Sequence, residues 1–164
     1  MKSLIILFLS GSVFIVACAK NKIENSTMES VFKEINTNSD YTFYKNDSSI
    51  LPSSPESAHT AFFRVRFNAK AASALTDNGK LPVNGTFPEG SIIVKDLYNT
   101  QNGAKVLYSV LKKDSSNPNS SNGWLWIEYE PNGKEIYNIN DKGAGCISCH
   151  SNNDRDNVRL FNLF

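Results

Sequence analysis

Alternating apolar and polar positions run through the middle of the chain and predict β-strands. In AFFRVRF (61–67), Phe63, Val65 and Phe67 share one face of an extended segment. The opposite face carries Phe62 and two arginines. Further runs of strand length, separated by turn residues, cover 91–98, 104–113, 123–130 and 134–139. We therefore expect a twisted antiparallel sheet of about five strands with a few short helices, in a mainly β or α+β domain.

Helical spacing is limited to two short stretches. The apolar residues of MESVFKEI (28–35) recur at helical intervals, which predicts an amphipathic helix. A second helix is predicted over AKAASALT (69–76), because Asn68 before it is a suitable N-cap. The polar stretches 19–27 and 45–57 are predicted to form a tether and a loop.

The N-terminus has the pattern of an export signal. Lys2 is followed by an apolar run that is too short and too early to be a convincing membrane span. The run ends in Ile-Val-Ala-Cys (15–18), which resembles a bacterial lipobox, where the cysteine is lipidated and the residues before it are removed. The alternatives are an ordinary signal peptide with a chance cysteine, or an uncleaved anchor. We expect a signal peptide over 1–17 and a lipid anchor on Cys18.

Export divides the chain and limits its partners. Residues 18–57 are expected to hold the lipidated cysteine, the tether and the short helix, and 58–164 to form the folded domain. The protein would be anchored in the bacterial cell envelope, with this domain in the periplasm or facing outward. Ala19, in place of an acid after the cysteine, favours the outer membrane. The formal net charge of +1 provides no basic field for nucleic acid.

The remaining cysteines lie in GCISCHS (145–151), which contains the attachment signature of c-type haem, C-x-x-C-H. Cys146 and Cys149 would form thioethers to the two vinyl groups, and His150 would bind the iron as proximal ligand. A thioredoxin-like redox pair would need a βαβ unit, which the pattern does not contain. A structural zinc site would need a fourth ligand, and His59 is the one candidate. We predict one covalently bound haem c.

Few residues are suited to the opposite side of the iron, where His or Met is usual. The candidates are His59, Met28 and Met1, and export would remove Met1. Met28 falls on the apolar face of the predicted helix, which favours a core contact. His59 stands at a loop edge before the first long strand, where it would be exposed, cap the strand, or act as a distal ligand. This scarcity favours an open distal position that binds small molecules.

Lys95 interrupts an otherwise apolar strand face. In SIIVKDL (91–97) it lies between Ile93 and Leu97 on one face. One interpretation is an edge lysine that reaches water. The other is a lysine that points into an apolar pocket, where desolvation would lower its pKa and leave a nucleophilic amine.

Several landmarks together resemble the cytochrome P-460 family, which includes the cytochromes c′-β. The resemblance extends from about His59 to the C-terminus. Its most specific block is GKLPVNGTFPEGSIIVKDLY (79–98), in which a Pro-Glu-Gly turn leads into the Val-Lys strand. The other landmarks, in chain order, are FRVRFNAKAASAL (63–75), YSVLKKD (108–114), GWLWIEYEPNG (123–133), CISCH (146–150) and DRDNVRLF (154–161).

The resemblance implies an antiparallel sheet packed against the haem, frequently in a homodimer, with His150 as proximal ligand and a vacant distal site. In the cytochromes P-460 proper, the lysine at the position of Lys95 is joined covalently to the haem edge. Those proteins oxidise hydroxylamine. The c′-β members lack the link and bind nitric oxide in an apolar pocket.

The chain departs from the hydroxylamine-oxidising members at one position. Their distal carboxylate corresponds to a position near Ser109, and a hydroxyl cannot replace a carboxylate as a general base near neutral pH. Glu128 and Glu130, on the next strand, are the acids that could substitute.

These features predict a lipid-anchored mono-haem cytochrome that binds or oxidises hydroxylamine or nitric oxide and exchanges electrons with a partner cytochrome. Whether it is an enzyme stays open. The alternatives are a gas-binding protein without turnover, or an electron carrier with His59 as sixth ligand.

Overall fold

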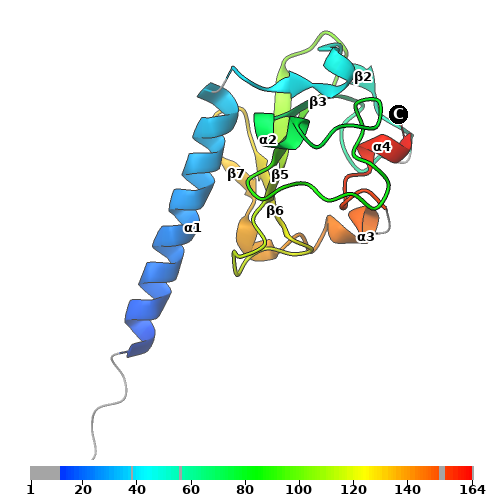
Figure 1. Cartoon of the computed structure of the whole chain (residues 1–164). Coiled ribbons are helices and arrows are strands. Elements are labelled where there is room, and N and C mark those ends of the chain that lie inside the picture. The colour runs from blue at the N-terminus through cyan, green and yellow to red at the C-terminus, as the bar shows by residue number, and fades with distance from the viewer. Residues whose placement is uncertain (1–11, 38, 56, 152–153, 164) are drawn as a thin grey trace, which may run out of the picture.

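The computed structural model describes residues 12–37, 39–55, 57–151 and 154–163, and its ribbon is drawn in Figure 1. For residues 12–21, 23, 162 and 163 the description covers the backbone alone. The first part of the predicted signal peptide and the side chain of Cys18 therefore lie outside the described residues. None of the helices in the described part of the chain is long and apolar enough to cross a membrane.

A single antiparallel sheet forms the centre of the molecule, in the order β1-β3-β4-β5-β6-β7, with β2 also paired to β3. The predicted mainly β or α+β class is confirmed, and the sheet is larger than the five strands expected. The additional strands, β1 and β2, have two residues each, too few for an alternating pattern to reveal them. The strands are β1 (Thr42–Phe43), β2 (Leu51–Pro52), β3 (Phe62–Phe67), β4 (Ile92–Tyr98), β5 (Lys105–Lys113), β6 (Trp124–Tyr129) and β7 (Glu135–Tyr137).

Helix α1 (Ser12–Thr37) covers one face of the sheet with its C-terminal half. Met28, Val31 and Ile35 are buried there against residues of β4, β5 and β6. The prediction of a short helix preceded by a tether is wrong, because residues 19–27 belong to the same helix. This stretch contains no Gly or Pro, and buried Glu24 accepts hydrogen bonds from Asn119 and Asn140 of the domain.

A buried charge cluster joins α1 to the sheet on the same face. The carboxylate of Asp96 is fully buried and forms salt bridges with Arg66 at 3.3 Å and with Lys105 at 3.1 Å. Arg66 also donates from Nη1 to the carbonyl of Ile35 at the end of α1, at 2.8 Å. The cluster therefore fixes the position of this helix on the sheet.

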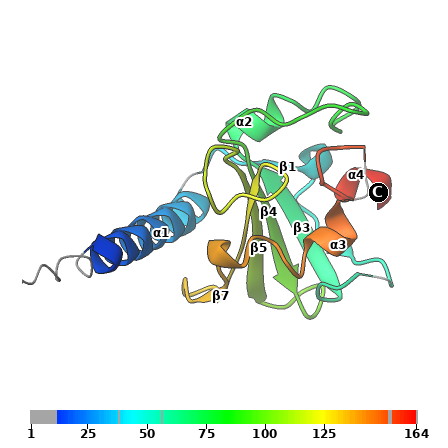
Figure 2. The same ribbon diagram turned by 90° about the horizontal axis from the view of Figure 1, so that it is seen from below.

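The opposite face of the sheet is covered by the short helices and the C-terminal segment, as Figure 2 shows. Asn68 caps α2 by accepting a hydrogen bond from the Ala71 amide, as predicted, although the helix is shorter than expected. Phe161, in the last helix, packs on Phe67 and Phe87. These helices are α2 (Ala69–Ala72), α3 (Ile147–His150) and α4 (Leu160–Leu163), and 3-10 turns cover Tyr44–Asn46 and Ile139–Asp141.

Candidate haem site

A row of side chains crosses the sheet on the face opposite α1. Cross-strand pairing joins Val65 to Lys95, Lys95 to Ser109, Ser109 to Glu128, and Glu128 to Tyr137. Residues that are directly paired in an antiparallel sheet project to the same side. All five line one cavity of about 340 Å³.

The other wall of this cavity contains the whole C-x-x-C-H motif. Cys146, Cys149 and His150 line it from α3 and its N-terminal turn. Both cysteines are free thiols. Apolar side chains of the sheet, among them Phe63 and Trp126, complete the lining.

The turn before the motif brings α3 close to the sheet. Gly143 has φ +70°, and a Cβ at this position would lie 2.6 Å from the Trp126 ring. The Gly143 carbonyl accepts hydrogen bonds from the amides of Cys146 and Ile147. The Gly145 amide donates to the Tyr137 hydroxyl at 3.3 Å. Only glycine combines this backbone conformation with so close an approach to the indole.

His150 is oriented by the C-terminal segment. Its Nδ1 lies 2.8 Å from the carbonyl of Asn157, which can only accept, so Nδ1 carries the proton and Nε2 carries the lone pair. Asp156, the residue before Asn157, holds this part of the chain in place. Its carboxylate forms a salt bridge with Lys113 at 2.8 Å and accepts a hydrogen bond from the amide of Phe87 at 2.8 Å. Burial lowers the pKa of His150, which favours the neutral form that binds a metal.

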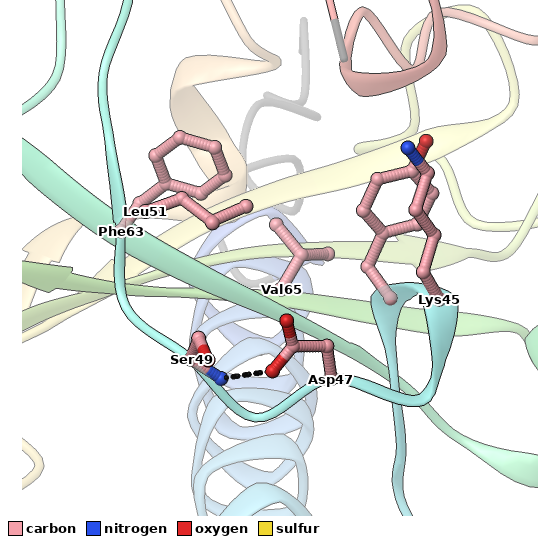
Figure 3. A pocket seen from close by; sticks show the side chains of 7 residues that line it. Lys45, Asp47, Ser49, Leu51, Phe63 and Val65 are labelled. Carbon is pink, nitrogen blue, oxygen red and sulfur yellow. Dashed lines mark hydrogen bonds between the residues drawn. The ribbon is translucent and has the colours of Figure 1, made fainter.

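These residues fit a c-type haem. Two free thiols in the spacing of the attachment signature and an imidazole with a fixed Nδ1 proton line one cavity with largely apolar walls. A neighbouring depression of about 310 Å³, shown in Figure 3, shares Phe63 and Val65 with the cavity. It contains neither a cysteine nor a histidine and is lined instead by Lys45, Asp47 and other residues of the segment before β3.

Lys95 lies in the cavity and not at an edge of the sheet. Its Nζ stands 4.6 Å from the centre of the Phe63 ring. Burial lowers the pKa of this amine to about 8. The side chain therefore occupies the apolar environment that the second of the two sequence interpretations describes.

His59 lines the same cavity from the loop before β3. Its ring centre lies 6.4 Å from that of His150, and the two ring planes are nearly perpendicular, at 83°. Burial, followed by the positive charges of Lys95 and His150, lowers the pKa of His59 to about 3. Met28, the other candidate ligand, belongs to α1 and is fully buried against the far side of the sheet, so it cannot reach this cavity.

The two candidate acids have different environments. Glu128 lines the cavity, where burial raises its pKa and a hydrogen bond from Ser109 acts in the opposite direction. Glu130 lies beyond the end of β6 and pairs with Lys134 at the surface, at 3.0 Å. Only Glu128 of this pair shares the site with the motif.

Some cavity residues were missed by the sequence interpretation. Tyr137 belongs to the predicted strand 134–139 and lies opposite Glu128 in the strand register, but its place in the site was not predicted. Arg159 and three serines, at 53, 54 and 57, come from loops whose position no periodic pattern indicates.

Comparison with known families agrees with this site. A family model described as cytochrome P460 matches residues 41–160. The matched segment contains the cavity-lining strands and the whole motif. A comparison with curated proteins finds no match. The match covers well over half of the chain, and the protein therefore belongs to the cytochrome P460 family of c-type haem cytochromes.

Proposed function

We propose that this cytochrome carries one covalent haem c, and that it binds or oxidises a small nitrogen species, hydroxylamine or nitric oxide, at its iron. The observation that carries this proposal is the single cavity in which the C-x-x-C-H helix faces Lys95 and Glu128. Electron transfer alone does not require a buried amine and a buried acid in the haem cavity.

The motif residues would hold the haem. The sulfurs of Cys146 and Cys149 form the thioethers, and His150 ligates through Nε2 while Asn157 holds its Nδ1 proton. A bound haem supplies a metal that accepts a nitrogen lone pair and exchanges single electrons.

Glu128 is the residue suited to handle protons. Oxidation of hydroxylamine to nitric oxide releases one proton for each electron that leaves. A carboxylate whose pKa is raised by burial is a stronger base than an exposed one, which suits it to accept such a proton. The Ser109 hydroxyl keeps the carboxylate oriented by its hydrogen bond. The electrons pass to a partner cytochrome.

Binding without turnover is the second candidate function. Phe63, Ile93 and Leu111 give the cavity an apolar wall, which suits uncharged nitric oxide. The two functions differ in whether the buried acid has a chemical role.

Glu128→Gln, with Glu130→Gln as matched control, separates them. We expect Glu128→Gln to lower hydroxylamine-dependent reduction of an electron acceptor by about 100-fold. Nitric oxide binding, followed by absorption spectroscopy, should be unchanged. Glu130→Gln should match the unaltered protein in both measurements, since Glu130 lies outside the cavity.

The outcomes are distinct. Nitric oxide binding with no hydroxylamine turnover in the unaltered protein would establish the gas-binding function instead. A haem-loaded protein that binds neither molecule would contradict both.

We also propose that the protein is lipidated on Cys18 and is attached to the outer membrane, with the haem domain in the periplasm or facing outward. The lipobox-like end of the N-terminal apolar run supports this, and haem attachment outside the cytoplasm is consistent with it.

A further inference from the structure

The loop between β2 and β3 forms part of the cavity wall and carries His59. Ser57 and Ala58 of this loop also line the cavity. Figure 2 shows α3 beside the sheet, on the side away from α1, and residues of α3 line this cavity.

The loop is held at its base by backbone and side-chain contacts. The Ser53 amide donates to the carbonyl of Ala61 at 2.8 Å, and its hydroxyl donates to the carbonyl of Thr60 at 2.6 Å. The amide of His59 itself donates to the Ser57 hydroxyl at 3.2 Å. His59 therefore has a defined backbone position above the cavity.

The separation of the two imidazoles matches that of a pair bound to one metal. A metal–imidazole bond is about 2 Å long, so two rings on opposite sides of one metal have centres roughly 6 Å apart. The observed distance between His59 and His150 is 6.4 Å. The perpendicular ring planes are compatible with this arrangement, since each ring can turn about its own bond to the metal.

The sequence offers no competing imidazole. The chain contains two histidines, and both line this cavity. Of its two methionines, Met28 lies in α1 and is buried against the far side of the sheet. The remaining nitrogen donor with a lone pair available near neutral pH in the lining is Lys95, which the experiment below treats as the rival ligand.

We infer that His59 is the sixth ligand of the iron in the resting protein, and that a small nitrogen ligand binds by displacing it. The inference rests on the proposed function for the displacing ligand, but the ligation by His59 can be tested without that ligand. The protein would then bind nitric oxide or hydroxylamine only in the fraction of molecules in which His59 has left the iron.

The test is the absorption and electron paramagnetic resonance spectrum of the ferric holoprotein, with no ligand added. We expect a six-coordinate low-spin haem in the unaltered protein and a high-spin haem in His59→Ala. Imidazole added to His59→Ala should restore the low-spin form. Lys95→Met, the matched control at the rival donor, should stay low-spin.

Ligand binding provides a second readout. In His59→Ala the apparent affinity for nitric oxide should rise by at least about tenfold, because no internal ligand has to leave. In the unaltered protein the observed binding rate should level off at high nitric oxide concentration, where departure of His59 becomes limiting.

Several results would overturn the inference. A high-spin resting haem in the unaltered protein would do so without any variant. Loss of the low-spin form in Lys95→Met, but not in His59→Ala, would assign the position to the lysine. If His59→Ala becomes high-spin yet neither protein binds nitric oxide or hydroxylamine, the ligation by His59 stands and the proposed function fails.

Discussion

At the scale of single residues, burial changes the chemistry of Lys95. It stands in the middle of β4, with Val65 and Ser109 as its neighbours across the sheet. Burial disfavours the ammonium form and lowers the pKa from the usual 10.5 to about 8. A fraction of the amine is therefore neutral and nucleophilic near physiological pH, which a covalent link to the haem edge would require.

The shifted pKa predicts a pH dependence of stability. Because the pKa is lower in the folded chain, the unfolded chain holds more protons between about pH 8 and 10.5. The Lys95 contribution to the free energy of unfolding should therefore rise with pH across this window. We expect chemical denaturation of the unaltered holoprotein to show this rise and Lys95→Met to lack it. A lysine joined covalently to the haem would not titrate in this way, so equal pH profiles in the two proteins would contradict a free, buried amine at this position.

Residue patterns predicted the two faces of each strand but not which face would meet the haem. The alternation of apolar and polar positions places Lys95 and Glu128 on one face of the sheet and Asp96 and Ile127 on the other, as the structure shows. His59 could not be positioned in this way, because its place above the cavity depends on a loop and on the pairing of β2 with β3.

At the scale of elements, the turn into α3 determines where the haem-binding motif lies. Gly143 adopts a left-handed conformation directly beside Trp126 of β6. The contact holds the first cysteine of the motif near the sheet and therefore near Lys95 and Glu128. The geometry of the site depends on this one close approach as much as on the motif itself.

Gly143→Ala should damage the site, while Gly145→Ala should not. A Cβ on Gly143 would clash with the indole, and its φ of +70° is unfavourable for alanine by roughly 1–2 kcal/mol. Gly145 has no atom within 4 Å of an added Cβ. We expect a lower haem-to-protein ratio and a lower melting temperature in Gly143→Ala alone. Equal loading in the two variants would show that the contact with Trp126 is not required.

Element prediction succeeded where the pattern was long enough. The five longer strands follow the alternation, and Asn68 caps α2 as expected. Helix α1 extends much further than its apolar face suggested, because polar residues without Gly or Pro continue a helix whose end is already packed on the sheet.

At the scale of the whole molecule, the two faces of the sheet differ in what packs against them. One face is sealed by α1 through an apolar cluster and the Asp96 charges. The other face borders the cavity, whose opposite wall contains the haem-binding motif. The predicted anchor, Cys18, belongs to the helix that covers the sealed face.

Cys18→Ser should release the protein from membranes. The proposed lipid chains would supply the anchorage by burying methylene groups in the membrane. In fractionated cells we expect the unaltered protein in the membrane fraction and Cys18→Ser in the soluble periplasmic fraction, with unchanged haem absorption. Membrane retention of a Cys18→Ser protein from which residues 1–17 have been removed would contradict the proposed lipidation.

Helix α1 has a mechanical consequence for a lipid-anchored protein. A helix rises about 1.5 Å per residue, so the six steps from Cys18 to Glu24, whose carboxylate is already bonded to the domain, span roughly 9 Å. As Figure 1 shows, the N-terminal part of α1 projects beyond the sheet, while the helix from Glu24 onward contacts the domain. The helix would act as a rigid spacer and not as a flexible linker. It would set both the distance of the haem from the lipid surface and the direction in which the haem cavity opens. A redox partner could then reach the haem only from a restricted range of approach angles.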